Sequence, residues 1–166
     1  MRIGIDAMGG DFAPAECIKG VLLASKVADT SLKIILFGVE EKIKQCFADE
    51  NEQVPSCVEI VNCPDVIEMA ESPTRGFAGK PNSSIAVGFS YLKEGKIDSF
   101  GSAGNTGAML VGAMFSVKAI PGVLRPAIGA VLPRPNKKYG LLLDVGANAD
   151  CRPDVLAQFS ILGSLY

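Results

Sequence analysis

The segment GSAGNTGAML, residues 101–110, places three glycines, two hydroxyl side chains and one amide within seven consecutive residues. A short apolar run precedes it and a longer one follows, as expected for a strand, a tight turn and a helix. Glycine allows a backbone to approach a ligand closely, and the N–H groups at a helix N-terminus favour a bound anion. The spacing therefore predicts a phosphate-binding loop formed by Ser102, Gly104, Asn105, Thr106 and Gly107.

This glycine loop differs from the two common nucleotide-binding patterns. It has neither the lysine of the G-x-x-x-x-G-K-[ST] phosphate loop nor the spacing of the G-x-G-x-x-G dinucleotide fingerprint. A plainer alternative is a tight turn in which Asn105 and Thr106 only cap the helix that follows. The residues alone leave both alternatives open.

Other polar residues lie where predicted strands end or predicted helices begin. They are Asp6 and Asp11 after the first strand, Lys80, Ser83 and Ser84 before a helix, Arg125, and Asp144 with Asn148 after a late strand. Because a doubly wound sheet brings such ends together, these side chains are candidates for one shared site. Each has a structural alternative, namely turn formation, helix capping, a solvated charge or, for Arg125, a surface ion pair.

Apolar periodicity predicts an α/β fold. Strands are expected over residues 2–7, 32–38, 57–63 and 97–102, and helices over residues 14–28, 39–50, 83–95, 105–119 and 153–166. Residues 64–82 contain three prolines and predict a long irregular loop, whereas residues 125–133 and 138–146 predict an antiparallel pair of strands. Alternating strands and helices indicate an open, mainly parallel, doubly wound sheet, and we expect a single domain over residues 1–166.

The composition excludes several kinds of chemistry. The 166-residue chain has no histidine, which rules out a Ser-His-Asp triad, a histidine base and a Cys/His zinc site. Its five cysteines are odd in number and irregularly spaced, so we expect reduced thiols and no metal site. The net charge of −2, without a basic cluster, argues against nucleic-acid binding.

The ends of the chain and its apolar runs predict a cytoplasmic protein. Met1 leads directly into RIGID, without the apolar segment of a signal peptide, and the apolar run over residues 108–117 is too short to cross a bilayer. The last predicted helix, within PDVLAQFSILGSLY, carries a broad apolar stripe and no strand follows it. We therefore expect that the chain is part of a longer protein.

Four segments together resemble a known family. They are IGIDAMGGDFAP, SAGNTGAML, GVLRPAIGAVLP and LLLDVGAN, in this order over residues 3–148. The series is similar to that of the bacterial phosphate acyltransferases, the acyl-[acyl-carrier-protein]:phosphate acyltransferases of the PlsX family. The resemblance implies the N-terminal half of such a chain. It also implies a three-layer α/β fold akin to the isocitrate and isopropylmalate dehydrogenases and to phosphotransacetylase.

The activity that this resemblance implies is transfer of a fatty acyl group from acyl-[acyl-carrier-protein] to inorganic phosphate. The acyl phosphate that forms would feed phospholipid synthesis, and the enzyme would be a homodimer, loosely associated with the inner face of the membrane. Phosphate is itself the nucleophile and a thioester is already activated, so positioning and electrostatics can supply most of the catalysis. We accordingly expect no cofactor.

For this chemistry we expect roles for individual residues. The candidate catalytic residues are Asn105, Thr106, Lys80, Asp144 and Asn148. Ser102, Gly104 and Gly107 would complete the phosphate loop with Ser83 and Ser84, and Lys80 or Arg125 would neutralise charge. The segment GKPNSSI departs from the family, which usually has a second basic residue before the double serine.

Two other functions are compatible with the same residues. The fold class alone would also suit a dehydrogenase-like enzyme that uses NAD, although fold does not assign function. The chain could instead be a non-catalytic fragment that only binds phosphate.

Overall fold

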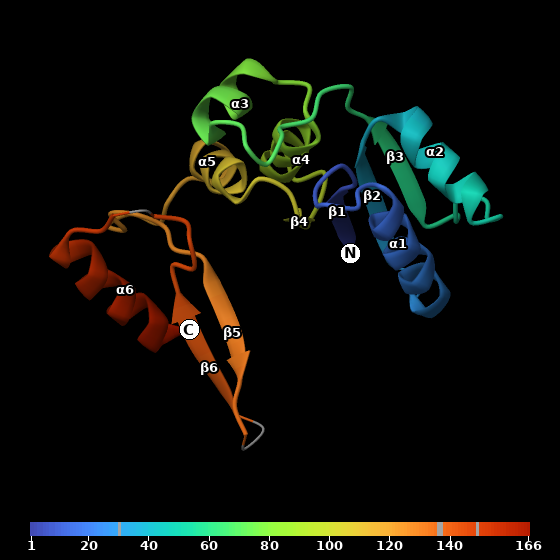
Figure 1. Ribbon diagram of the computed structural model, residues 1–166. Helices are drawn as coiled ribbons and strands as arrows, with labels where there is room; N and C mark the ends of the chain where they lie inside the picture. The colour runs from blue at the N-terminus through green and yellow to red at the C-terminus, as the bar shows by residue number, and fades with distance from the viewer. Residues whose placement is uncertain (30, 136–137, 149) are drawn as a thin grey trace. The chain divides into compact units, whose positions relative to one another are not determined.

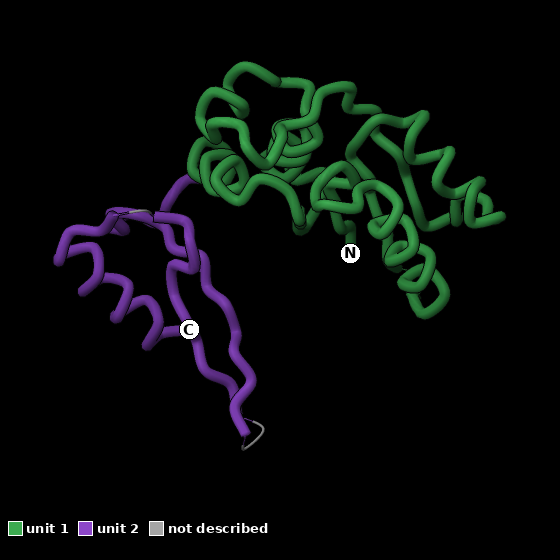
Figure 2. Tube along the Cα trace, viewed as in Figure 1, with its two compact units in different colours: residues 1–117 green, residues 118–166 purple. Residues whose placement is uncertain are grey.

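The computed structural model describes residues 1–29, 31–135, 138–148 and 150–166. They form two compact units, Met1–Val117 and Lys118–Tyr166, which are coloured separately in Figure 2. Each unit contains a sheet of its own. The expectation of one α/β domain over residues 1–166 stays a prediction.

The first unit is built on a four-stranded parallel sheet, as the sequence predicts. Its strands are β1 (Arg2–Asp6), β2 (Lys33–Gly38), β3 (Val58–Asn62) and β4 (Ser99–Gly101). Their order across the sheet is β3-β2-β1-β4, and all neighbouring strands are parallel. The chain moves outward from β1 to β3 and then crosses to the other side of β1. This reversal creates a topological switch point between β1 and β4, where α/β proteins bind ligands.

Helices cover both faces of this sheet (Figure 1). Strand β2 shows why they must, since its residues from Ile34 to Gly38 are all buried. Ile34 and Leu36 pack with apolar residues of α1 (Ala15–Val27) and α2 (Glu40–Asp49). On the other face, the Phe37 ring lies edge-on to Tyr91 of α4 (Ser84–Lys93), with 5.0 Å between ring centroids. Each large side chain buried in this way contributes about 1.5–3 kcal/mol.

A third apolar cluster joins α4 to two further helices, α3 (Pro73–Gly79) and α5 (Thr106–Ser116). Its buried members are Ile67, Ile85, Phe89 and Ala108. The prediction that residues 64–82 form an irregular loop is wrong for α3. This helix is too short to show apolar periodicity, and its signals are a proline in the first turn and the buried Gly76, which lies against Ile67.

The second unit is a hairpin covered by one helix. Strands β5 (Gly129–Pro133) and β6 (Tyr139–Leu143) are antiparallel, which confirms the predicted pair. Helix α6 (Pro153–Leu165) buries Val155 and Phe159. Part of the connecting segment RPNKK, residues 136 and 137, lies outside the described residues.

Among the residues that the structure describes, no helix has both the length and the apolar character needed to span a membrane.

Close helix packing in the first unit predicts opposite effects for two glycine-to-alanine substitutions. A Cβ atom at Gly112 in α5 would collide with the Phe89 ring and lie 2.8 Å from Phe77, whereas one at Gly20 in α1 would meet nothing within 4 Å. We expect Gly112→Ala to lower the free energy of unfolding by about 1–3 kcal/mol. Gly20→Ala should raise it by about 0.5–1 kcal/mol through helix propensity. Urea unfolding of both variants measures this, and equal effects would contradict the packing argument.

Candidate functional site

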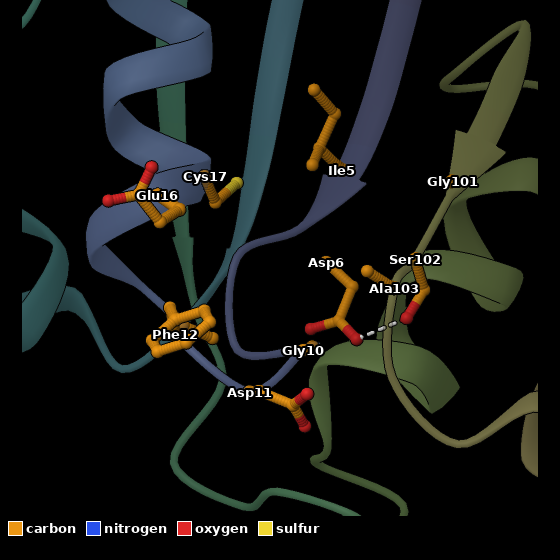
Figure 3. Close-up of a pocket in the computed structure, with 12 residues that line it drawn as sticks. Ile5, Asp6, Gly10, Asp11, Phe12, Glu16, Cys17, Gly101, Ser102 and Ala103 are labelled. Atoms are coloured by element: carbon orange, nitrogen blue, oxygen red, sulfur yellow. Dashed lines mark hydrogen bonds between the residues drawn. The ribbon is translucent and has the colours of Figure 1, made fainter.

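A chain of hydrogen bonds links the end of β1 to the loop that follows β4, and Figure 3 shows its central bond, between Asp6 and Ser102. The Ser102 hydroxyl donates to Oδ2 of Asp6 at 2.6 Å, and the Gly104 backbone N–H donates to Ser102 Oγ at 2.9 Å. Oδ1 of Asp6 accepts a further bond from the backbone N–H of Met8 at 3.0 Å. Asp6 is only 3% exposed, so these bonds satisfy a carboxylate that burial would otherwise penalise. These hydrogen bonds therefore connect the carboxyl end of β1 to the loop after β4 at the switch point.

Glycines make this contact sterically possible. A Cβ atom at Gly9 would lie 2.6 Å from the Gly104 nitrogen, 2.7 Å from Asp6 Oδ2 and 2.8 Å from Ser102 Oγ. One at Gly104 would lie 3.2 Å from the Gly9 Cα. The two loops thus touch backbone to backbone, and the first role of Gly104 is to permit this contact.

Asn105 is the N-cap of α5 and is tied to a distant loop. Its Oδ1 accepts a hydrogen bond from the Ala108 N–H at 2.9 Å. Its Nδ2 lies 2.9 Å from the Glu68 carbonyl oxygen, 3.0 Å from that of Glu71 and 3.4 Å from that of Met69. The side chain is 4% exposed with both ends engaged. Its geometry suits a residue that positions the loop and the helix start.

The next two residues differ in their surroundings. Thr106 begins α5 and is exposed, and the first-turn N–H groups of a helix lack acceptors within that helix. At Gly107 a Cβ atom would collide with Pro73 of α3, so this glycine permits close helix packing. At the start of α5, Thr106 is thus the exposed residue of the predicted phosphate loop.

Lys80 lies at the C-terminal end of α3 and is engaged within the loop before it. Its Nζ donates to Glu71 Oε2 and to the Val66 carbonyl oxygen, each at 2.7 Å. The hydrogen bond from Lys80 lowers the pKa of Glu71 below its ordinary value, and the Glu68 N–H bond adds to the effect. Lys80 and Asn105 therefore hold the same loop from two sides.

Ser83 and Ser84 lie at the start of α4, as predicted, but both are buried. Ser83 is 0% exposed and accepts a hydrogen bond from the Ala86 N–H at 3.3 Å, and Ser84 is 1% exposed. Ser83 therefore acts as the N-cap of α4, as the structural alternative for this residue predicts.

Three predicted site residues belong to the second unit. Asn148 Nδ2 donates to Asp144 Oδ1 at 2.8 Å and to the Pro126 carbonyl oxygen at 3.2 Å. Arg125 is exposed and donates through Nη1 to the Asp150 carbonyl oxygen at 3.1 Å. Asp144 and Asn148 form a cluster of their own within that unit.

A cavity of about 340 Å³ adjoins the Asp6–Ser102 contact. Twelve residues line it, and Figure 3 draws them. They come from β1, the loop between β1 and α1, the first turn of α1, the end of β4 and the turn after it: Ile5, Asp6, Gly9, Gly10, Asp11, Phe12, Ala13, Glu16, Cys17, Gly101, Ser102 and Ala103. Burial, together with the charge of Asp6, raises the pKa of the Cys17 thiol to about 11. Among the described residues, no group of three or more His, Cys, Asp or Glu side chains could hold a metal ion.

Two contacts on which this region depends have no signal in the local sequence. Asp6 was recognised as lying at the end of a strand, but its partner is 96 positions away, and no local pattern reveals that distance. Glu71 lies in the predicted irregular loop, where its pairing with Lys80 had no signal in the spacing of residues.

The first unit has an open parallel α/β fold with glycine-rich loops at the switch point. The family described as "Fatty acid synthesis protein" matches residues 1–166, and the chain belongs to this family.

Several curated relatives that match are named phosphate acyltransferase. The phosphate acyltransferase of Gloeobacter violaceus is 46% identical over 169 residues, and that of Dictyoglomus thermophilum is 42% identical over 166 residues. Both alignments cover 100% of this chain and 48% of the relative. The chain therefore spans about half the length of the curated relatives it matches.

Among solved structures, the EutD phosphotransacetylase from Staphylococcus aureus is similar in fold. Its TM-score is 0.60 at 19% identity, and the match covers 97% of this chain and 51% of that chain. At this identity the likeness concerns the fold alone.

The hydrogen bonds of Asn105 predict a structural cost when the side chain is removed. Asn105→Ala loses the helix cap and the three contacts to the loop, so we expect the free energy of unfolding to fall by about 2–4 kcal/mol. Hydrogen exchange of residues 68–71 should also become faster. The control Thr106→Ala removes an exposed side chain and should cost less than about 1 kcal/mol. Unchanged exchange in Asn105→Ala would contradict this account.

The raised pKa of Cys17 predicts slow alkylation in the folded protein. A pKa of about 11, against an ordinary value of 9.0, leaves about a hundredfold less thiolate at pH 8. Iodoacetamide should therefore modify Cys17 at least tenfold more slowly in the native than in the urea-unfolded protein, as peptide mass spectrometry would show. Since the folded state keeps this proton to higher pH, the contribution of Cys17 to stability is lost as pH rises from about 9 to about 11.

Proposed function

We propose that the full-length protein transfers a fatty acyl group from acyl-[acyl-carrier-protein] to inorganic phosphate. The observation that carries this proposal is the match of the whole chain, at 42–46% identity, to relatives named phosphate acyltransferase. The family description, fatty acid synthesis protein, agrees with it. The acyl phosphate product would supply phospholipid synthesis.

The reaction requires little covalent chemistry from the protein. A phosphate oxygen attacks the thioester carbonyl carbon, a carbon–oxygen bond forms, and the carbon–sulfur bond breaks as the thiol leaves with a proton. The enzyme has to hold an anion beside a carbonyl group and stabilise the developing negative charge. A helix N-terminus next to glycine loops provides fixed N–H dipoles for this purpose.

Phosphate would bind at the N-terminus of α5. The exposed Thr106 hydroxyl and the first-turn N–H groups of Thr106 and Gly107 would be its donors. Ser102, Gly104 and Asn105 would act by positioning, since their polar groups are engaged within the protein. This proposal differs from the expectation of one phosphate loop, because within that loop it assigns direct contact with phosphate to Thr106 and Gly107 alone.

The remaining candidates would contribute charge or orientation. Arg125, which is exposed, is a candidate for neutralising phosphate, and Lys80 would serve by holding the loop that Asn105 contacts. Asp144 and Asn148 would orient neighbouring groups, and Ser83 and Ser84 would support the start of α4. Each of these roles belongs to the proposal.

We also propose the finer features that the resemblance implies. They are a three-layer fold akin to the isocitrate and isopropylmalate dehydrogenases, a cytoplasmic homodimer, and loose association with the inner membrane face. Large apolar side chains are exposed on the second unit, including Leu132, Leu142 and Ile161. They support the proposal that this protein associates with another surface, such as a second subunit or a membrane.

The direct test uses the full-length protein with acyl-[acyl-carrier-protein] and labelled phosphate. Labelled acyl phosphate is the expected product, and its absence under conditions where the protein is folded would refute the proposal.

The phosphate site predicts a specific kinetic defect in Thr106→Val. Loss of a hydrogen bond to an anion should raise the KM for phosphate by about tenfold to a hundredfold, with little change in melting temperature. Thr106→Ser keeps the hydroxyl and should restore most of the affinity. Ser90→Ala removes an exposed hydroxyl of α4 that bonds Glu94, and it should leave the KM unchanged. A wild-type KM in Thr106→Val would remove this residue from the site.

A further inference from the structure

We propose that the cavity beside β1 and β4 binds the alkyl chain of the acyl donor. This inference rests on the proposed function, because an enzyme that forms acyl phosphate must hold a long apolar chain as well as an anion. The two substrates differ so much in chemistry that they need separate surfaces. The lining of this cavity suits the apolar substrate, the alkyl chain.

The walls of the cavity are largely apolar. Ile5, Phe12, Ala13, Cys17 and Ala103 contribute side chains without a formal charge, and three glycines contribute backbone only. The raised pKa of Cys17 agrees with an environment from which water is partly excluded. A volume of about 340 Å³ lies within the range of small-molecule pockets.

The charges around the cavity argue against phosphate as its occupant. The twelve lining residues include Asp6, Asp11 and Glu16 but no lysine or arginine. Asp6 is buried with both oxygens hydrogen-bonded, and Glu16 pairs with Lys19 at 2.8 Å on the exposed side of α1. A phosphate group in this cavity would be repelled by the carboxylates and would find no cation to neutralise it. An alkyl chain is uncharged and requires no cation.

Phe12 supplies an independent sign of an apolar ligand. Its side chain is 75% exposed, although it lines the cavity. In Figure 3 it lies below the first turn of α1, with Cys17 above it. Covering an exposed aromatic ring at the edge of an apolar cavity removes apolar surface from water, which favours the binding of an apolar ligand.

The cavity also lies where a reaction with phosphate at α5 requires it. Ser102 and Ala103 line the cavity and belong to the turn that leads into α5. A thioester whose alkyl chain fills the cavity would therefore present its carbonyl carbon near the N-terminus of that helix. Attack by phosphate there would form the acyl phosphate and release the carrier thiol.

Substitutions of exposed side chains test this inference without disturbing the folded structure. Phe12→Ala should lower kcat/KM for hexadecanoyl carrier protein by about tenfold, because fewer methylene groups are covered, and leave the butanoyl thioester within about twofold. Leu23→Ala is the matched control, since Leu23 is 68% exposed on α1 and does not line the cavity. Both thioesters should react with this control as with the wild type.

A side chain that fills the cavity should also impair the long thioester more than the short one. Gly101 is paired with Ile5 in the sheet, and a Cβ atom there would meet nothing within 4 Å. We expect Gly101→Leu to lower kcat/KM for the hexadecanoyl thioester by about thirtyfold more than for the butanoyl thioester. Gly20→Leu places the same side chain in open space on α1, outside the cavity, as a control.

The possible outcomes separate the inference from the proposed function. A loss confined to the long thioester supports the alkyl-chain assignment. Equal losses for both thioesters, an altered KM for phosphate alone, or no change in Phe12→Ala would overturn it while leaving acyl transfer established. If the wild-type full-length protein forms no acyl phosphate from either thioester, the proposed function itself fails.

Discussion

The hydrogen bond between Asp6 and Ser102 is the contact on which the switch point depends. It joins the ends of two neighbouring parallel strands at 2.6 Å, and Ser102 passes the constraint to the Gly104 backbone two residues before α5. A buried carboxylate without partners would be costly, so the two loops must stay together to satisfy it. This contact therefore helps to position the turn that leads into α5.

A second set of contacts extends this order to the loop between β3 and α4. Asn105 holds the carbonyl groups of Glu68 and Glu71, and Lys80 holds the Glu71 carboxylate and the Val66 carbonyl. Residues that look like ligands for phosphate thus build the frame around the helix start. They fix the position of the α5 N-terminus, and the N–H groups at the start of a helix form preorganised dipoles that favour anions.

The elements of the fold could be predicted from sequence better than the contacts of the site. Buried strands such as KIILFG and the amphipathic helix with Ile18, Val21 and Leu22 carry their own periodic signal, and the structure confirms them. The short helix α3 has no such signal. The side chain of Asn105 was expected at a helix start, and it is there, but its partners lie 34–37 residues away. Local spacing identifies a cap, whereas long-range partners appear only when the chain is folded.

The backbone contact between the two glycine loops limits how this protein can change in evolution. A side chain at Gly9 would strike the Gly104 nitrogen, the Asp6 carboxylate and the Ser102 hydroxyl together. No single compensating substitution could relieve all three, because one of them is backbone. Sequence drift at residue 9 is therefore coupled to drift almost a hundred positions away, and the two loops have to be inherited as a matched pair.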